Sequence, residues 1–158
     1  MNPTFDTQLF RQTLGQFATG VTVISFVRDG AVCGMTVNSF TSVSLDPPLV
    51  LFCPALSTRF ALEAAIGELF TVSILAEDHQ DVSWHFAGRS RFTEAPWRKD
   101  DELPPAVMGS VGWIRCRTST LHTHGDHLIV VAEVLEFGSD SNIRPLLFFR
   151  GDYPKLEP

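Results

Sequence analysis

Short runs of β-branched and apolar residues, each ended by a turn signal, constrain the fold of this chain more than any other feature. Residues 21–27 read VTVISFV, residues 28–30 read RDG, and residues 31–37 return as a second apolar run. β-Branched residues favour strands, and Asp-Gly is a typical hairpin turn. The pattern predicts two antiparallel strands, at 21–27 and 31–37, joined by a tight turn.

The same reading extends along the chain. It predicts further strands at residues 49–53, 69–75, 111–116, 128–137 and 146–149, and a long surface loop at 89–105. It also predicts three helices, which begin near Asp6, Ser57 and Asp78 and end at Gly20, Gly67 and Gly88. Helices and strands do not alternate regularly, and no G-x-G-x-x-G follows the first strand, which disfavours a Rossmann domain. We expect one domain over residues 1–158, mainly β with flanking helices, built on an antiparallel barrel.

Composition excludes several classes of protein. A net charge of −6 argues against a nucleic-acid surface, and no apolar run is long enough to span a membrane. The N-terminus lacks the pattern of a secretory signal. The three cysteines, Cys33, Cys53 and Cys116, are widely spaced in apolar segments, which predicts reduced, buried thiols in a cytoplasmic protein. Thirteen Phe and three Trp against one Tyr indicate a large core or, as we favour, surface buried against a second subunit.

The segment from Thr36 to Ser44 is polar although it joins two apolar runs. It holds six side chains with hydroxyl or amide groups. One interpretation is a hydrogen-bonded turn. The other is a site for a flavin ring, whose edge alternates acceptors and a donor that backbone amides and small polar side chains match, with Met35 and Phe40 as apolar walls.

Two further clusters have a functional and a structural interpretation. Ser57, Thr58 and Arg59 stand at a predicted helix start, where amides, hydroxyls and a guanidinium could bind one phosphate; the alternative is a plain helix cap. His122, His124 and His127 suggest a zinc site, but no second cysteine or acidic pair completes a tetrahedral set, so no metal is expected. His127 then follows a hairpin turn at Gly125-Asp126. No G-x-S-x-G elbow or nucleophilic cysteine motif supports a hydrolase.

Several sequence runs occur in an order that is similar to the order in a known family. The runs FATGVTVI at 17–24 and GMTVNSFTSVSLDPPLV at 34–50 precede Ser57–Arg59, Phe86-Ala87-Gly88, Gly125-Asp126-His127 and PLLFF at 145–149. In this order they resemble the short-chain flavin reductases, the reductase components of two-component flavin monooxygenases. The resemblance covers about the whole chain.

The resemblance implies a homodimer of Greek-key FMN-binding split β-barrels that uses NADH or NADPH to reduce FMN or FAD by hydride transfer. Reduced flavin would then pass to a separate monooxygenase. The resemblance places the nicotinamide near His127 and the flavin ring on a loop that includes Met35, Thr36, Val37, Asn38, Ser39 and Ser42. It assigns the flavin phosphate to Ser57 and Thr58, beside Arg59, with Cys53 and Pro54 leading toward it and Phe86 and Gly88 approaching the cofactor.

Two other functions stay open at this point. One is an FMN-binding electron-transfer protein that does not oxidise NAD(P)H directly. The other is a barrel without enzymatic activity whose aromatic surface serves assembly only. Only a reductase would consume NADH when flavin is added, so this assay distinguishes it from both alternatives. In a reductase the cofactors carry the chemistry and the protein positions them.

Overall fold

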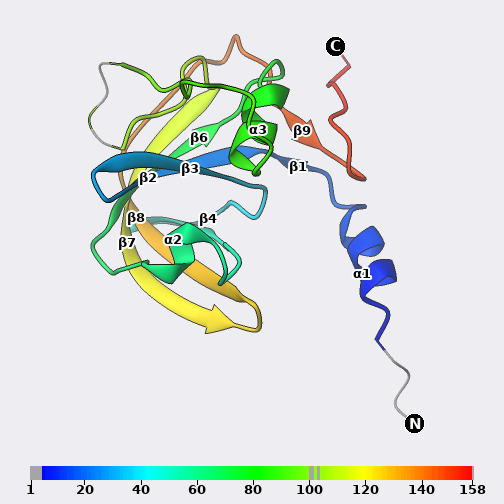
Figure 1. The fold of residues 1–158 in the computed structure, drawn as a ribbon, viewed down its shortest axis with the longest axis horizontal. Helices are drawn as coiled ribbons and strands as arrows, with labels where there is room; N and C mark the ends of the chain where they lie inside the picture. The colour runs from blue at the N-terminus through cyan, green and yellow to red at the C-terminus, as the bar shows by residue number, and fades with distance from the viewer. Residues whose placement is uncertain (1–4, 100–101, 103, 158) are drawn as a thin grey trace.

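The computed structural model describes residues 5–99, 102 and 104–157. This part of the chain is mainly β, with three short helices, as the sequence predicts. Figure 1 shows the strands gathered in one body, with α1 projecting from it toward the N-terminus. In chain order the elements are α1 (Thr7–Leu14), β1 (Thr19–Gly20), β2 (Thr22–Arg28), β3 (Ala31–Val37), β4 (Thr41–Leu45), β5 (Pro48–Phe52), α2 (Arg59–Leu62), β6 (Leu69–Ile74), α3 (Gln80–Phe86), β7 (Gly112–His124), β8 (His127–Ser139) and β9 (Leu147–Phe148).

The first predicted hairpin is confirmed. Strands β2 and β3 pair antiparallel from Thr22 with Val37 to Arg28 with Ala31. Asp29 and Gly30 form the turn with φ angles of 52° and 74°. Two successive left-handed residues match the right-handed twist of a hairpin, and Asp-Gly is the dipeptide that adopts this geometry most readily.

A seven-stranded antiparallel sheet contains most of the strands, in the order β3-β2-β6-β7-β8-β5-β4. Its two edge strands, β3 and β4, are consecutive in sequence and are joined by residues 38–40 alone. That link reaches about 14 Å at full extension, whereas the edges of a flat seven-stranded sheet lie about 29 Å apart. The sheet must therefore curl to bring these two edges toward each other. The remaining strands, β1 and β9, pair separately.

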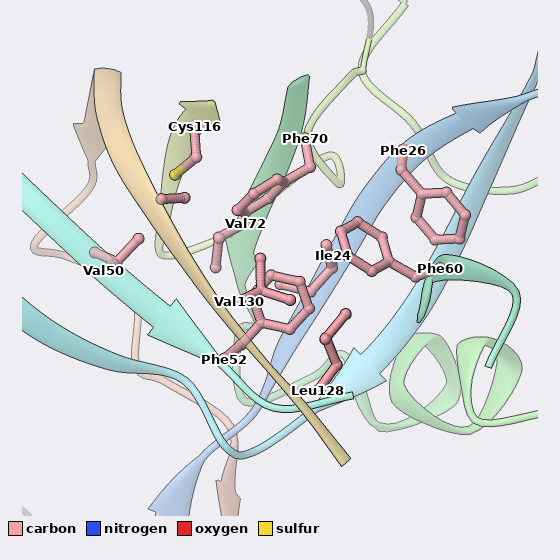
Figure 2. Close-up of a cluster of buried hydrophobic side chains, with 11 residues drawn as sticks. Ile24, Phe26, Val50, Phe52, Phe60, Phe70, Val72, Cys116, Leu128 and Val130 are labelled. Atoms are coloured by element: carbon pink, nitrogen blue, oxygen red, sulfur yellow. The ribbon is translucent and has the colours of Figure 1, made fainter. Parts of the chain in front are cut away.

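Four phenylalanine rings form the centre of the core that the sheet encloses. Phe26, Phe52 and Phe70 surround Phe60 of α2, and the ring pairs Phe26–Phe60 and Phe52–Phe60 meet edge to face with centroids 5.2 Å apart. Figure 2 shows these rings with aliphatic side chains from several strands. Cys116 lies among them as a free thiol, and burial raises its pKa to about 12. The prediction of three buried thiols is wrong for Cys33 and Cys53, which are also free but only partly buried.

Several predicted elements differ from the structure. The strand predicted at 111–116 is longer, since β7 runs to His124. Residues 41–45, interpreted as part of a loop, form β4. The helix after Thr58 ends at Leu62, not at Gly67, because Gly67 N bonds Thr118 O and Ala65 N bonds the Glu68 carboxylate, which draws the backbone away from a helical path. The first helix ends at Leu14, and residues 19–20 form β1.

The long loop predicted at residues 89–105 has no regular helix or strand where the structure describes it; residues 100, 101 and 103 lie outside the described part. A bridge between Trp97 and Val107 ties the loop to the segment that follows it. Over the described residues, no helix is long and apolar enough to cross a membrane.

Candidate functional site

Three segments far apart in the sequence surround one cavity of about 470 Å³. They are the end of β3 with the link to β4, the loop that leaves β5, and the first residue of β8. Nine of the fourteen residues that the sequence predicts for the site line this cavity, with Ala55 as a tenth: Met35, Thr36, Val37, Asn38, Ser39, Cys53, Pro54, Thr58 and His127. The sequence could not point to Ala55, because its methyl group carries no chemistry and it contributes mainly backbone.

Ser39 ties the first segment to the second. Its Oγ accepts a hydrogen bond from Cys53 N at 2.9 Å and lies 3.3 Å from Cys53 O. The hydroxyl therefore satisfies the backbone N–H and C=O of Cys53, which a neighbouring strand would otherwise do at the end of β5. Pro54 follows without an N–H and ends the strand.

Backbone hydrogen bonds tie the second segment to the tip of the β7–β8 hairpin. Leu56 N donates to Asp126 O and Leu128 N donates to Pro54 O, both at 2.9 Å, and Ala55 forms a bridge with His127. These bonds hold His127 at the cavity, although β7 and β8 project well beyond the rest of the sheet in Figure 1.

Asp126 orients the ring of His127. The Nδ1 of His127 lies 2.7 Å from Asp126 Oδ1, and this hydrogen bond is the main reason that the pKa of the Asp126 carboxyl is lowered. A carboxylate only accepts hydrogen bonds, so Nδ1 carries a proton and, in the neutral ring, Nε2 is left as an acceptor. The His127 side chain is 46% exposed and open to a ligand.

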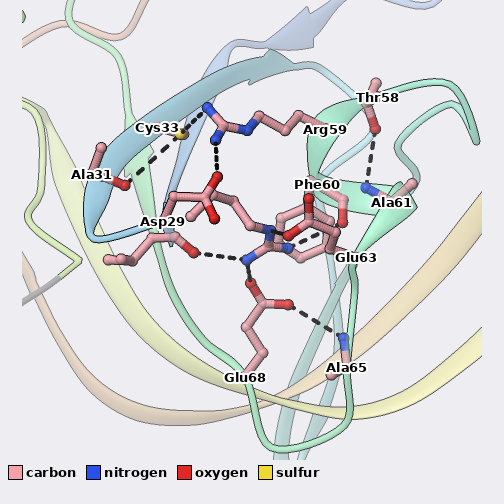
Figure 3. A network of polar contacts seen from close by, with 12 residues as sticks. Asp29, Ala31, Cys33, Thr58, Arg59, Phe60, Ala61, Glu63, Ala65 and Glu68 are labelled. Atoms are coloured by element: carbon pink, nitrogen blue, oxygen red, sulfur yellow. Dashed lines mark hydrogen bonds and ion pairs between the residues drawn. The ribbon is translucent and has the colours of Figure 1, made fainter.

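Two residues of the predicted phosphate cluster, Thr58 and Arg59, form hydrogen bonds within the protein. Thr58 caps α2: its Oγ1 accepts from Ala61 N at 3.3 Å and donates to Ala55 O at 2.8 Å. Arg59 does not line the cavity; its guanidinium bonds Asp29 at 3.0 Å and Cys33 Sγ at 3.2 Å, as Figure 3 shows. Ser57 is exposed beside the cavity, and no described residue bonds its hydroxyl. Only part of the cluster therefore points to an anion.

Three other predicted residues lie away from the cavity. Ser42 is exposed on β4 opposite Val50. Phe86 stacks on Trp97 with ring centroids 4.8 Å apart, and both rings cover Gly34 on the outer face of β3. Gly88 is exposed after α3 with a φ of 89°. Their roles at a ligand stay predictions.

A second cavity, of about 550 Å³, adjoins the first and was not predicted from the sequence. Residues 17–22 of the β1 region, residues 38–41 and Ile74 line it, so Asn38 and Ser39 belong to both cavities. Phe40, predicted as a wall of the same site as Met35, lies here instead. The reason is that the short link between β3 and β4, residues 38–40, lies between the two cavities, and Phe40 lines only the second one.

The ionisable groups of the site do not form a metal centre. Over the described residues, no group of three or more His, Cys, Asp or Glu side chains could hold an ion. Burial raises the pKa of the Cys53 thiol, so the cysteine that lines the cavity is not an activated nucleophile.

Comparison with known proteins assigns the sequence to one family over nearly its whole length. The family described as "Flavin reductase like domain" matches residues 14–157. The chain is 38% identical to HsaB, the reductase subunit of a flavin-dependent monooxygenase from Mycobacterium tuberculosis, over 100% of this chain and 87% of that protein. It is 38% identical to SmoA of Agrobacterium fabrum, an FMN reductase (NADH), over 93% of this chain and 84% of the relative.

Solved structures of similar proteins have the same fold. Flavin reductase PheA2 superposes with a TM-score of 0.89 at 35% identity, covering 98% of this chain and 100% of that one. The Streptomyces globisporus NADH:FAD oxidoreductase SgcE6, solved with NAD and FAD fragments, superposes with a TM-score of 0.88 at 33% identity, covering 97% and 94%.

Proposed function

The chain belongs to the family of flavin reductase-like domains, and from this premise we propose that it is an NAD(P)H-dependent reductase of FMN or FAD that supplies reduced flavin to a separate monooxygenase. The main support from this chain's own residues is that nine predicted site residues, from three segments far apart in the sequence, line a single cavity. Relatives named as reductase subunits of monooxygenases and as NADH-dependent flavin reductases support the reaction and the partner.

The cavity suits a flavin ring in size and chemistry. Its volume of about 470 Å³ lies in the range of small-molecule sites. Met35, Val37 and Pro54 supply apolar walls. The side-chain amide of Asn38 has no hydrogen-bond partner among the described residues, so both its donors and its acceptor are available to a ring edge. When bound, the flavin supplies a ring that accepts a hydride from the nicotinamide.

The protein contributes position and exclusion of water. Residues 35–39 would hold the ring edge, and Ser39 fixes this segment to Cys53. His127, oriented by Asp126, offers its Nε2 as an acceptor for the carboxamide of a nicotinamide. Holding two reactants in near-attack geometry is the largest contribution that such residues make without a general acid.

At the other end of the ligand we propose that Ser57 and Thr58 bind the flavin phosphate, with Arg59 nearby. Thr58 lines the cavity and Ser57 is exposed next to it, which supports this placement. The free amides at the start of α2 add donors to the two hydroxyls.

The curled sheet supports a finer assignment, the Greek-key split β-barrel of FMN-binding proteins. Its edge strands β3 and β4 are joined by three residues yet do not pair with each other, as expected for a barrel that stays open along one seam. We also propose one domain over residues 1–158 and a cytoplasmic location, which the three free thiols support.

A homodimer is the assembly that we propose, and α1 supports it. The helix buries none of its residues, and its apolar side chains Leu9, Phe10 and Leu14 are 47–59% exposed. An eight-residue helix is only marginally stable without packing. A second copy of the chain would cover this face.

An anaerobic assay matrix of NADH and NADPH against FMN, FAD and riboflavin tests the reaction. We expect NAD(P)H to be oxidised in stoichiometry with flavin bleaching. Flavin that binds but bleaches only with another donor would instead identify an electron-transfer protein. Absence of both binding and oxidation would contradict the proposed function altogether.

A further inference from the structure

Strand β3 carries one wall of the cavity, the Met35–Ser39 wall, which consists of residues 35–39. β3 is an edge strand and pairs only with β2 in the sheet. Met35 and Val37 face the core, whereas Gly34 and Thr36 face the opposite side, toward α3. Whatever fixes α3 against β3 therefore fixes the outer side of this wall.

Two successive hydrogen bonds link the wall to the C-terminal segment through α3. Thr36 Oγ1 donates to Ser83 O at 2.7 Å, and Ser83 Oγ lies 2.8 Å from the hydroxyl of Tyr153 in a second hydrogen bond. Ser83 is completely buried. The link runs from the cavity wall through the middle of α3 to the only tyrosine in the chain.

Tyr153 is itself well anchored. Its ring contacts Trp84 of α3 edge to face at 6.1 Å and Phe148 of β9 at 5.6 Å between centroids. Phe148 is paired with Thr19 of β1, next to the second cavity. Tyr153 and Phe148 both pack against the smaller apolar cluster of the core, which includes Val82 of α3. These contacts fix the ring of Tyr153 and therefore the position of its hydroxyl.

We propose that Ser83 and Tyr153 are positioning residues of the flavin site, which hold α3 so that Thr36 keeps the Met35–Ser39 wall in place. Neither residue lines the cavity, and neither would touch the ligand. The inference rests on the proposed function, since the wall matters only if a flavin binds there. Small displacements of positioning groups are costly, because both affinity and reactive geometry depend on them.

Two hydroxyl deletions test the link. Tyr153→Phe keeps the ring contacts and Ser83→Ala keeps the carbonyl that Thr36 bonds, so each removes only the bond between Ser83 and Tyr153. Dissociation constants for riboflavin and FMN, measured by quenching of flavin fluorescence, should rise about two- to tenfold, the range of one lost hydrogen bond. The rise should be equal for both flavins, because the phosphate lies elsewhere in the site. The double variant should bind no more weakly than either single one, since all three lack the same bond.

Matched variants separate positioning from general stability. Ser110→Ala also removes a short hydroxyl bond, to Val107 O at 2.7 Å in the loop before β7, but Ser110 neither lines the cavity nor takes part in the link from Thr36 to Tyr153. It should leave both dissociation constants unchanged. Thr36→Val should weaken both flavins as Tyr153→Phe does, and Thr36→Ser should restore binding because it keeps the donor to Ser83 O.

The outcomes are distinct. Equal weakening of riboflavin and FMN in Tyr153→Phe and Ser83→Ala, with wild-type affinity in Ser110→Ala, supports the inference. Wild-type affinity in both deletions overturns it, even if their Tm falls, because the bond would then serve stability alone. A wild-type protein that binds neither flavin overturns the proposed function, and the inference falls with it.

Discussion

At the scale of single residues, we propose His127 as the group that recognises the hydride donor. Asp126 fixes its ring through Nδ1 and leaves Nε2 free at the cavity. We predict that His127→Ala raises the apparent KM for NADH about tenfold, the value of one good hydrogen bond, while the KM for flavin changes less. Steady-state kinetics with each substrate varied in turn measures both constants.

His122→Ala is the matched control for this variant. His122 is exposed on β7, pairs with Ile129, and does not line the cavity. Its removal should leave both constants unchanged. Unchanged NADH kinetics in His127→Ala would remove His127 from the nicotinamide site.

The phosphate prediction also concerns single residues. We expect Ser57→Ala combined with Thr58→Ala to weaken FMN about tenfold or more, because hydrogen bonds to a charged group are worth more than neutral ones, and to spare riboflavin. Titration with both flavins measures the difference. Thr58→Ser serves as control, since it keeps the cap of α2 on Ala61 N. Equal losses for both flavins would contradict the phosphate assignment and indicate that the cap was lost instead.

At the scale of elements, the packing of α3 on β3 depends on the missing side chain of Gly34. A Cβ at this position would stand 2.4 Å from Phe86 Cδ1 and 2.9 Å from Trp97 Cη2. We predict that Gly34→Ala lowers the free energy of unfolding by about 1–3 kcal/mol, the usual cost of overpacking. It should also weaken flavin binding, because the displaced strand carries Met35. Chemical denaturation and flavin titration measure the two effects.

Gly20→Ala provides the comparison on another strand. A Cβ at Gly20 meets no atom within 4 Å, so the same chemical change should cost far less there. If Gly34→Ala were as stable as Gly20→Ala, the close packing of Phe86 and Trp97 on β3 would be wrong.

The start of α3 predicts a dependence of stability on pH. His79 accepts a hydrogen bond from Ala76 N through Nδ1, and burial lowers the pKa of its imidazole despite the nearby carboxylate of Asp78. In the unfolded chain the imidazole of His79 has a pKa of about 6.5. Below this pH the unfolded state binds a proton at His79 more readily than the folded state does. Stability should therefore fall as the pH drops through that value.

Melting temperatures across pH 5–8 test this expectation against a His79→Gln variant. Glutamine has no proton to gain in this range, so its curve should be flatter than that of the wild type. Parallel curves for the two proteins would show that His79 does not titrate as the structure indicates.

Local patterns predicted most of these elements, and the failures have physical causes. The hairpin at 22–37 was predicted because β-branched residues and Asp-Gly act locally. Strand β4 was missed because three of its five side chains are polar and its apolar ones, Val43 and Leu45, are exposed on an edge strand, so that no buried apolar run marks it. The early end of α2 was missed because its causes, the bonds of Gly67 to Thr118 and of Ala65 to Glu68, include a partner far along the chain.

At the scale of the whole molecule, the site exists because the sheet curls. Composition and periodicity could not predict that β5 pairs with β8 or that β3 and β4 become the two edges, since these pairings join distant segments. The polar composition of residues 36–44 indicated one segment of the cavity, whereas Cys53, Pro54 and the place of the nicotinamide were predicted through family resemblance. The same limit explains why the Ser83–Tyr153 link, between residues 70 positions apart, left no sequence signal.

The assembly is the last property at this scale, and α1 gives it a direct test. We predict that light scattering finds a particle of about twice the chain mass of 17.5 kDa. Leu9→Glu should weaken the dimer about tenfold or more, because it places a charge on a face where a leucine would otherwise be buried. Gln8→Glu adds the same charge to the opposite side of α1 and should leave the dimer intact. A wild-type monomer, or equal association of both variants, would show that α1 does not lie at an interface between two copies of this chain.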